Sequence, residues 1–120
     1  MKGILIVDDS PILRNSLRLL FQREGLEVCG EAADGQDAVA KALRLKPEII
    51  VLDLAMPVMN GITAGRIVKQ LLPSVTLILF SLSADLLSPE ELASAGFSAA
   101  ISKGHAETLV AKAQSLLAAA

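Results

Sequence analysis

The stretch of sequence that decides the fold is residues 48–61, EIIVLDLAMPVMNG. Four apolar residues, three of them β-branched, run directly into Asp53. A short apolar run bounded by turn residues is typical of a strand buried on both faces of a parallel sheet. Pro57 and Gly61 indicate a turn after this strand. Because burying a carboxylate costs free energy, Asp53 is a candidate functional residue.

Comparable patterns alternate along the rest of the chain. Residues 2–7 and 75–80 are further apolar runs, residues 26–32 alternate like an edge strand, and residues 98–101 form a weak fifth strand. Amphipathic helical patterns lie between these strands, over Leu13–Phe21, Ala38–Leu43, Ala64–Leu72, Ser88–Gly96 and Leu109–Leu117. Five strand–helix units in succession predict an α/β fold with a doubly wound parallel sheet, formed by one domain over residues 1–120.

Two of the expected helices have clearly marked ends. Ser10 is a candidate N-cap followed by Pro11, and Gly25 is placed to end the same helix. Ser88 and Glu91 have the spacing of a capping box. These residues predict where the first and fourth helices begin.

The composition excludes several classes of protein. Hydrophobic residues make up 52% of the 120 residues and charged residues 20%, which permits a packed core and argues against disorder. The net charge is −2 and the basic residues are scattered, which argues against nucleic-acid binding. No apolar run reaches the roughly 18 to 20 residues of a membrane span, so we expect a cytoplasmic domain. One cysteine, Cys29, and one histidine, His105, exclude an internal disulfide and multi-ligand zinc sites.

Polar residues follow the ends of the expected strands. Asp8 and Asp9 follow the first strand, Asp53 the third, Ser81 the fourth and Lys103 the fifth. An open parallel sheet gathers the carboxyl ends of its strands at one edge, so we expect these side chains to form one cluster. Three neighbouring carboxylates need a compensating charge, and Mg²⁺ is a suitable oxygen-seeking cation. The lysine and the hydroxyl can bind an anion, and an aspartate oxygen can attack phosphorus, which predicts a phosphoryl-accepting site.

Four segments of the sequence match the motifs of a known family: Ile6–Ser10, Leu52–Gly61, Phe80–Ser81 and Ile101–Lys103. In these segments the chain resembles the receiver domain of two-component response regulators. The resemblance covers nearly the whole chain, and it implies a flavodoxin-like (βα)5 fold with strand order 2-1-3-4-5. The segment Leu17–Val39 is most similar to receivers that precede a helix-turn-helix output domain.

The resemblance implies a metal site and a phosphoacceptor. Asp53 resembles the phosphoacceptor of the family. Asp9 and Asp53 resemble direct Mg²⁺ ligands, while Asp8 is expected to act nearby or through a water. The backbone carbonyl of Ala55 resembles the third protein ligand, which needs no particular side chain.

The resemblance also implies a switch and its partners. Ser81 resembles the hydroxyl that moves to the phosphoryl group, and Lys103 resembles the lysine that pairs with it. The implied phosphodonor is a sensor histidine kinase or a phosphotransfer protein, and the implied target is an output domain or a partner protein. The module would catalyse only its own phosphorylation and dephosphorylation. Neither nucleic acid nor a membrane is expected as a partner of this segment, and a homodimer through the last two helices stays open.

The sequence departs from the family pattern near the expected site. Gly104 stands where the family has a proline after the lysine, and Ala100 stands where it has an aromatic residue. Because Ala100 has no ring, we expect signalling through movement of loops and helices rather than through an aromatic switch. Ala55 and Ser83 stand where family side chains tune hydrolysis. Neither side chain can position a water as an acid or an amide does, so we expect a long-lived phosphoryl group.

Other interpretations of the cluster stay open. Asp8 and Asp9 also suit the start of a helix, and Asp53 with Lys103 also suits a structural ion pair. A phosphatase of the haloacid dehalogenase type is disfavoured, because Asp53 is not followed by a second acid at Ala55. The main alternative is a scaffold or dimerisation module that uses the same fold without phosphorylation.

The remaining chemically distinctive residues are expected to be structural. Arg14, Arg18, Arg23 and Lys41 are assigned to solvated helix faces rather than to a phosphate site. Cys29 is expected to be a small, half-buried residue of the edge strand.

Overall fold

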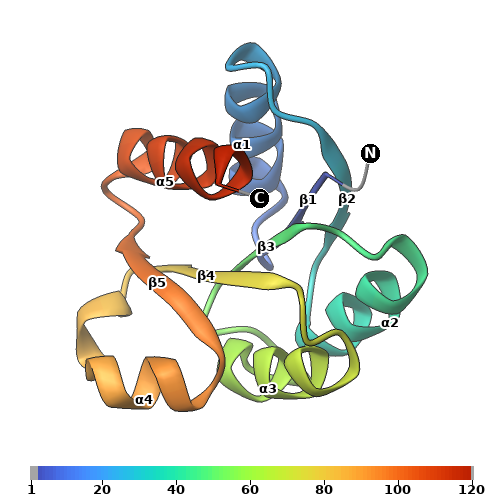
Figure 1. Ribbon diagram of the computed structural model, residues 1–120, viewed down its shortest axis with the longest axis vertical. Coiled ribbons are helices and arrows are strands. Elements are labelled where there is room, and N and C mark those ends of the chain that lie inside the picture. Colours follow the sequence, from blue (N-terminus) through green and yellow to red (C-terminus); the bar gives the residue numbers. More distant parts are fainter. Residues whose placement is uncertain (1–2, 120) are drawn as a thin grey trace.

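All five strands of the computed structural model lie in one parallel sheet with the order β2-β1-β3-β4-β5 (Figure 1). The structure describes residues 3–119, so Lys2 of the expected first strand lies outside the described residues. The strands are β1 (Ile4–Val7), β2 (Val28–Ala32), β3 (Ile49–Leu52), β4 (Thr76–Ser81) and β5 (Phe97–Ser102). The strand order and the doubly wound α/β class predicted from the sequence are therefore confirmed.

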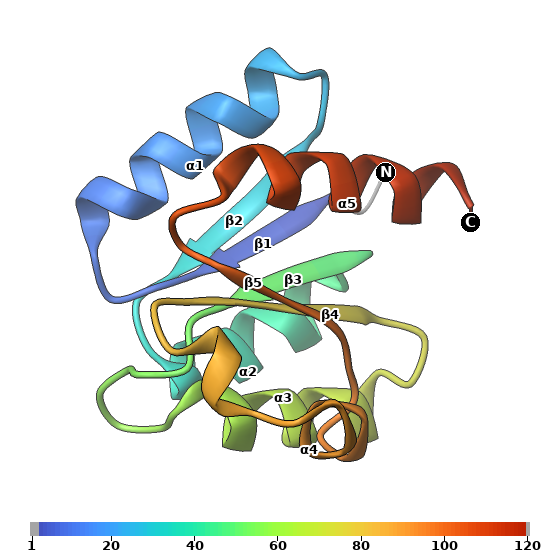
Figure 2. The same ribbon diagram turned by 90° about the vertical axis from the view of Figure 1, so that its left-hand side faces the viewer.

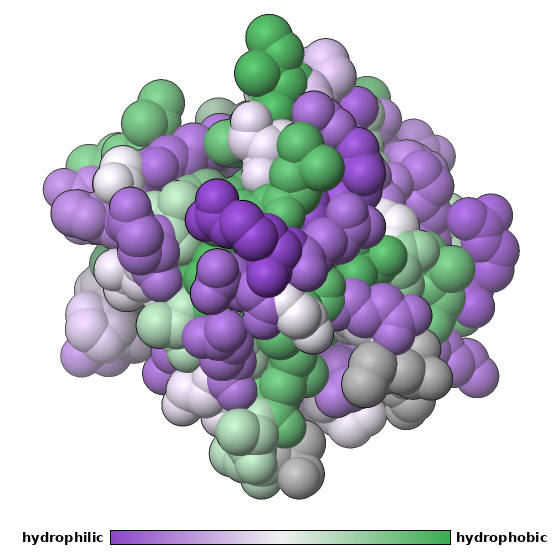
Figure 3. Space-filling model, turned by 90° about the horizontal axis from the view of Figure 1, so that it is seen from above, coloured by the Kyte–Doolittle hydropathy of each residue, from purple (hydrophilic) through white to green (hydrophobic). Residues whose placement is uncertain are grey.

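Within residues 3–119, four α-helices and one 3₁₀ turn connect these strands, and a fifth α-helix follows β5. The helices are α1 (Pro11–Arg23), α2 (Gly35–Leu45), α3 (Gly61–Leu71), α4 (Pro89–Ser94) and α5 (Ala106–Ala118), and the turn η1 is Ala84–Leu86. Figure 2 shows α1 and α5 on one face of the sheet and α2, α3 and α4 on the other. Figure 3 shows the α1–α5 side, where apolar surface is interrupted by polar surface. No helix among residues 3–119 combines the length and apolarity that crossing a membrane would require.

The core consists of two apolar layers, one on each face of the sheet. Successive strand residues alternate between the layers, as the pleat requires. The layer beneath α1 and α5 includes Ile4, Ile6, Ile49, Val51, Ile78, Phe80, Leu17, Phe21 and Leu109. The layer beneath α2 and α3 includes Leu5, Val7, Ile50, Leu52, Leu77, Leu79, Ala38, Ala64 and Val68. Burial of each large aliphatic side chain contributes about 1.5–3 kcal/mol, so these layers hold the strand ends in fixed positions.

The helix ends agree with the capping residues read from the sequence. The Ser10 hydroxyl accepts a hydrogen bond from the Leu13 amide at 3.2 Å. Ser88 and Glu91 form the reciprocal capping box of α4, at 3.0 and 3.1 Å. Gly25 follows α1 with φ +80°, a conformation that glycine adopts without strain.

The apolar stripes expected on α2 and α3 are correct at Leu72, which packs partly buried against the core, and wrong at Leu43 and Leu71. Leu43 is 43% exposed and Leu71 is 51% exposed. Small residues contact the sheet instead, and Ala42 and Gly65 are buried. A Cβ at Gly65 would lie 2.7 Å from the ring of Phe97. The helices thus approach the sheet through small side chains, and Leu43 and Leu71 stay exposed to solvent.

Candidate functional site

The buried polar side chains of the described residues all lie at the carboxyl edge of the sheet. They are Asp8, Asp53 and Ser81, at 2%, 5% and 2% exposure. Asp8 and Asp53 directly follow β1 and β3, and Ser81 is the last residue of β4. Burial of polar groups is costly unless they are paired, so their concentration at one edge distinguishes it from the rest of the molecule.

Lys103 supplies the positive charge of this cluster. Its Nζ lies 2.8 Å from Asp8 Oδ2 and 3.1 Å from Asp53 Oδ2. The Lys103 amide donates to the Ser81 carbonyl at 3.2 Å, which joins the end of β5 to the end of β4. Desolvation lowers the pKa of Lys103, but the hydrogen bonds and charges of Asp8 and Asp53 outweigh it and raise the pKa above its ordinary value. Lys103 is therefore held as a cation between two carboxylates.

Three carboxylates meet in a set that fits a hard divalent cation. One oxygen from each of Asp8, Asp9 and Asp53 lies within 4.8 Å of the other two. The Asp8 oxygens are already engaged, because Oδ1 accepts from the Ser10 amide at 2.9 Å and Oδ2 pairs with Lys103. Asp9 is exposed at the rim. An all-oxygen donor set with one exposed carboxylate suits Mg²⁺, which takes one or two carboxylates and keeps several waters.

Close backbone packing fixes the loop that follows Asp53. A Cβ on Gly61 would lie 2.0 Å from the Asp53 carbonyl oxygen, so only glycine fits there. The Gly61 amide donates to the Leu54 carbonyl at 2.9 Å. Between them, Val58 has φ +69°, which is rare for a β-branched residue, and its side chain is 75% exposed. Ala55 is exposed in this loop, and the metal-binding role of its carbonyl stays a prediction.

The β4 side of the site is built differently. The hydroxyl of Ser81 is buried and accepts from the Ser83 amide at 3.2 Å. Ala100 is half-buried opposite Leu79. Phe97 lies near the other end of β5, opposite Leu77, so its ring does not occupy the place of the missing aromatic residue.

An ion-pair network that the sequence does not indicate lies beside Asp8. The expectation that Arg14 lies on a solvated face is wrong, because its side chain is only 18% exposed. Its Nη1 donates to the Asp8 carbonyl at 2.7 Å, and its Nε pairs with Glu31 at 3.2 Å. Arg18 Nε pairs with the other Glu31 oxygen at 3.1 Å. The only signal in the sequence was the four-residue spacing of the two arginines, which places both on one face of α1.

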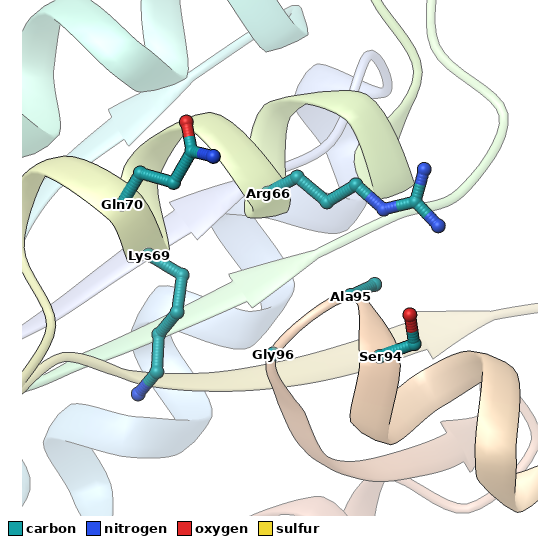
Figure 4. Close-up of a pocket in the computed structure, with 6 residues that line it drawn as sticks. All are labelled: Arg66, Lys69, Gln70, Ser94, Ala95 and Gly96. Atoms are coloured by element: carbon teal, nitrogen blue, oxygen red, sulfur yellow. The ribbon is translucent and has the colours of Figure 1, made fainter.

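A separate hollow of about 240 Å³ lies between α3 and α4 (Figure 4). It is lined by Arg66, Lys69, Gln70, Ser94, Ala95 and Gly96. The long polar side chains point in different directions, and the Lys69 amine donates to the Val75 carbonyl. These groups do not converge on one point, so we assign no ligand to this hollow.

Residues 4–114 match the family model of the response regulator receiver domain. The chain belongs to this family. Receiver domains of this family act as phosphorylation-activated switches of two-component systems, as the sequence predicted. The phosphatase interpretation is therefore set aside, and no finding favours the scaffold.

Receiver domains of both chemotaxis proteins and transcriptional regulators are similar to the chain. The chemotaxis protein CheY of Thermotoga maritima is 41% identical over 80 residues, which are 67% of each protein. A protein-glutamate methylesterase/protein-glutamine glutaminase of Anaeromyxobacter dehalogenans is 43% identical over 104 residues, 84% of this chain. The chain spans 30% of that relative and 23% of a second one, from Caldanaerobacter subterraneus.

Solved structures of receivers have the same fold. The response regulator domain of Thermotoga maritima CheB superposes with a TM-score of 0.84 at 28% identity, covering 94% of this chain and 93% of that one. A LuxR-family response regulator from Aurantimonas superposes with a TM-score of 0.86 at 32% identity, covering 97% and 84%. The receiver fold of this chain is thus shared by a CheB response regulator domain and by a LuxR-family response regulator.

Proposed function

We propose that Asp53 of this receiver accepts a phosphoryl group from a sensor histidine kinase or a phosphotransfer protein in the cytoplasm. The observation that carries the proposal is the buried Asp53 carboxylate beside the Lys103 amine, at 3.1 Å, within a three-carboxylate cluster. An Asp53 oxygen attacks phosphorus, the phosphorus–nitrogen bond to the donor histidine breaks, and its electron pair returns to the imidazole. The receiver catalyses this transfer and its later hydrolysis, and no other reaction is assigned to it.

Mg²⁺ fits the oxygen donors of the site and would be held by Asp9, Asp53 and the Ala55 carbonyl, with Asp8 nearby. When bound, the metal offsets the negative charge that gathers around the phosphoryl oxygens. Lys103 is already a cation beside Asp53 and pairs with the added phosphoryl group. The Ser81 hydroxyl, on the neighbouring strand, reorients toward the same group.

Phosphorylation then shifts the receiver between two conformations that an output domain or a partner protein distinguishes. Similar proteins include a protein-glutamate methylesterase/protein-glutamine glutaminase and a transcriptional regulatory protein, of which this chain spans 30% and 52%. The phosphoryl group is expected to persist well beyond seconds, because Ala55 and Ser83 offer no acid or amide to position a hydrolytic water. Loss of the phosphoryl group can be monitored by intact mass, and hydrolysis within seconds would contradict this expectation.

Intact mass after incubation with acetyl phosphate and Mg²⁺ tests the phosphoacceptor. The wild type should gain one phosphoryl group, whereas Asp53→Asn should gain none, and omission of Mg²⁺ should prevent the reaction. Asp85→Asn is a matched control, because Asp85 is an exposed aspartate of η1 outside the cluster. Equal labelling of Asp53→Asn and wild type would overturn the proposal.

A further inference from the structure

The Arg14 guanidinium links the site to the edge of the sheet. Its Nη1 donates to the Asp8 carbonyl at 2.7 Å, and its Nε donates to Glu31 Oε1 at 3.2 Å. Arg14 comes from the first turns of α1, and Glu31 comes from the edge strand β2. A planar guanidinium holds two acceptors in fixed directions, so the Asp8 carbonyl is held in place from outside its own strand.

Glu31 is a firm anchor for this contact. It lies opposite Ile6 in the β1–β2 register, and its carbonyl accepts from the Lys41 amine. Lys41 also pairs with Asp37 in α2 at 3.0 Å. The chain of contacts therefore joins α1, β2 and α2, three elements that the core already packs against β1.

The Asp8 carbonyl matters because it belongs to the peptide that carries Asp9. The peptide unit is planar, so fixing this carbonyl fixes the direction in which the Asp9 backbone leaves the strand. The Asp8 amide is held as well, since it donates to the Ala32 carbonyl at 3.0 Å. The exposed Asp9 carboxylate has no hydrogen bond or ion pair within residues 3–119, so its position depends on this backbone.

We infer that Arg14 is a positioning residue for the metal site: it orients the Asp8–Asp9 peptide so that Asp9 faces Asp53. The inference rests on the proposed function, because it concerns Mg²⁺ held by Asp9 and Asp53. The inference predicts the direction in which the Mg²⁺ affinity changes when Arg14 is replaced. The positive charge of Arg14 alone would weaken cation binding, so its removal would tighten Mg²⁺ binding if charge were its only effect. Loss of positioning weakens Mg²⁺ binding instead.

Isothermal titration with Mg²⁺ separates these effects. Arg14→Ala should raise the Mg²⁺ Kd about tenfold, the lower end of the range for residues that orient metal ligands. Arg14→Lys keeps the charge but lacks the planar fork, so its Kd should also rise. Arg18→Ala is the matched control: Arg18 pairs with the same Glu31 but does not contact Asp8, and its Kd should stay within about twofold of wild type.

The amide resonances of Asp9 and Ser10 in metal-free protein provide a second measurement. They should shift in both Arg14 variants and stay near their wild-type positions in Arg18→Ala. If Arg14→Ala does not fold, the folded Arg14→Lys variant carries the test. Mg²⁺ binding by the Arg14 variants that equals or exceeds that of wild type would overturn the inference alone. A wild type that binds no Mg²⁺ would overturn the proposed function, and the inference with it.

Discussion

The two sides of the site are held very differently. On the α1–β2 side, the Asp8 carbonyl is bound by Arg14, which is itself paired with Glu31. On the β4–α4 side, within residues 3–119, the buried Ser81 hydroxyl accepts a hydrogen bond only from the nearby Ser83 amide, and the short helix α4 has no buried residue. Leu86, in the η1 turn before α4, is 75% exposed. Segments with few buried contacts open at low free-energy cost, so the structure favours motion on the β4–α4 side while the carboxylates stay in place.

The largest expected effect concerns the loop after Asp53, which lies between these two sides and is fixed by close backbone packing. Gly61→Ala should lower the free energy of unfolding by about 3 kcal/mol, because its Cβ would lie 2.0 Å from the Asp53 carbonyl oxygen. Gly104→Ala, next to Lys103, is the control, since the nearest atom to its Cβ would be 3.9 Å away. The control should change stability by less than about 1 kcal/mol. Urea unfolding measures both, and similar losses in the two variants would contradict the difference in packing.

Lys103 links the two sides of the site, and its loss should have the next largest effect. Lys103→Met leaves Asp8 and Asp53 without their cation, and in EDTA the free energy of unfolding should fall by about 2 kcal/mol. This is less than for a fully buried pair, because the Lys103 side chain is 17% exposed. Lys112→Met in α5 is a control outside the cluster. No difference between the two variants would show that the ion pairs contribute nothing.

The contribution of Lys103 should also depend on pH in one direction. The folded-state pKa is raised above the ordinary value of 10.5, because the effect of the two carboxylates outweighs desolvation. Folding therefore gains from the charged lysine from neutral pH up to 10.5, where both carboxylates are ionised, and this gain is lost as the pH rises through the folded-state pKa. The stability difference between wild type and Lys103→Met should be constant from neutral pH to about 10 and shrink above it. A difference that grows above pH 10.5 would contradict the pKa direction.

The capping box of α4 gives the smallest expected effect and the most local one. Ser88→Ala removes the hydroxyl that accepts from the Glu91 amide, and should cost about 1 kcal/mol. Because α4 is short and has no buried residue, the cost should appear as faster hydrogen exchange in residues 89–95. Ser10→Ala removes the corresponding cap of α1, where exchange should change less because Leu17 and Phe21 anchor the helix. If the two substitutions accelerated hydrogen exchange equally in α1 and α4, the expected difference in local stability between the two sides of the site would be wrong.

The parts of the molecule that follow from local sequence were predicted well. The strands β1, β3 and β4 are built on short apolar runs, so the polar residues at their ends could be named, and the structure brings Asp8 and Asp53 into contact with Lys103. The caps at Ser10 and Ser88 were also readable, because a capping hydrogen bond spans only three residues.

The features that were not predicted depend on contacts between distant segments. The Arg14–Glu31 pair requires the rotation of α1 over β2, which helical periodicity does not specify. Val58 has a positive φ in the loop between Asp53 and Gly61, and a valine in the sequence does not indicate that conformation. The exposure of Leu71 follows from packing through smaller residues of α3.

We expect phosphorylation at Asp53 to move the β4–α4 side and to leave the α1–β2 side in place. Amide spectra of the protein with and without beryllofluoride and Mg²⁺ test it most directly, because beryllofluoride mimics the phosphoryl group. We predict shifts that extend from Ser81 through η1 and α4 into β5, with small shifts at Arg14 and Glu31. Shifts that are confined to the loops around Asp53 would contradict this expectation. Shifts at Arg14 and Glu31 that are as large as those in α4 would contradict it as well.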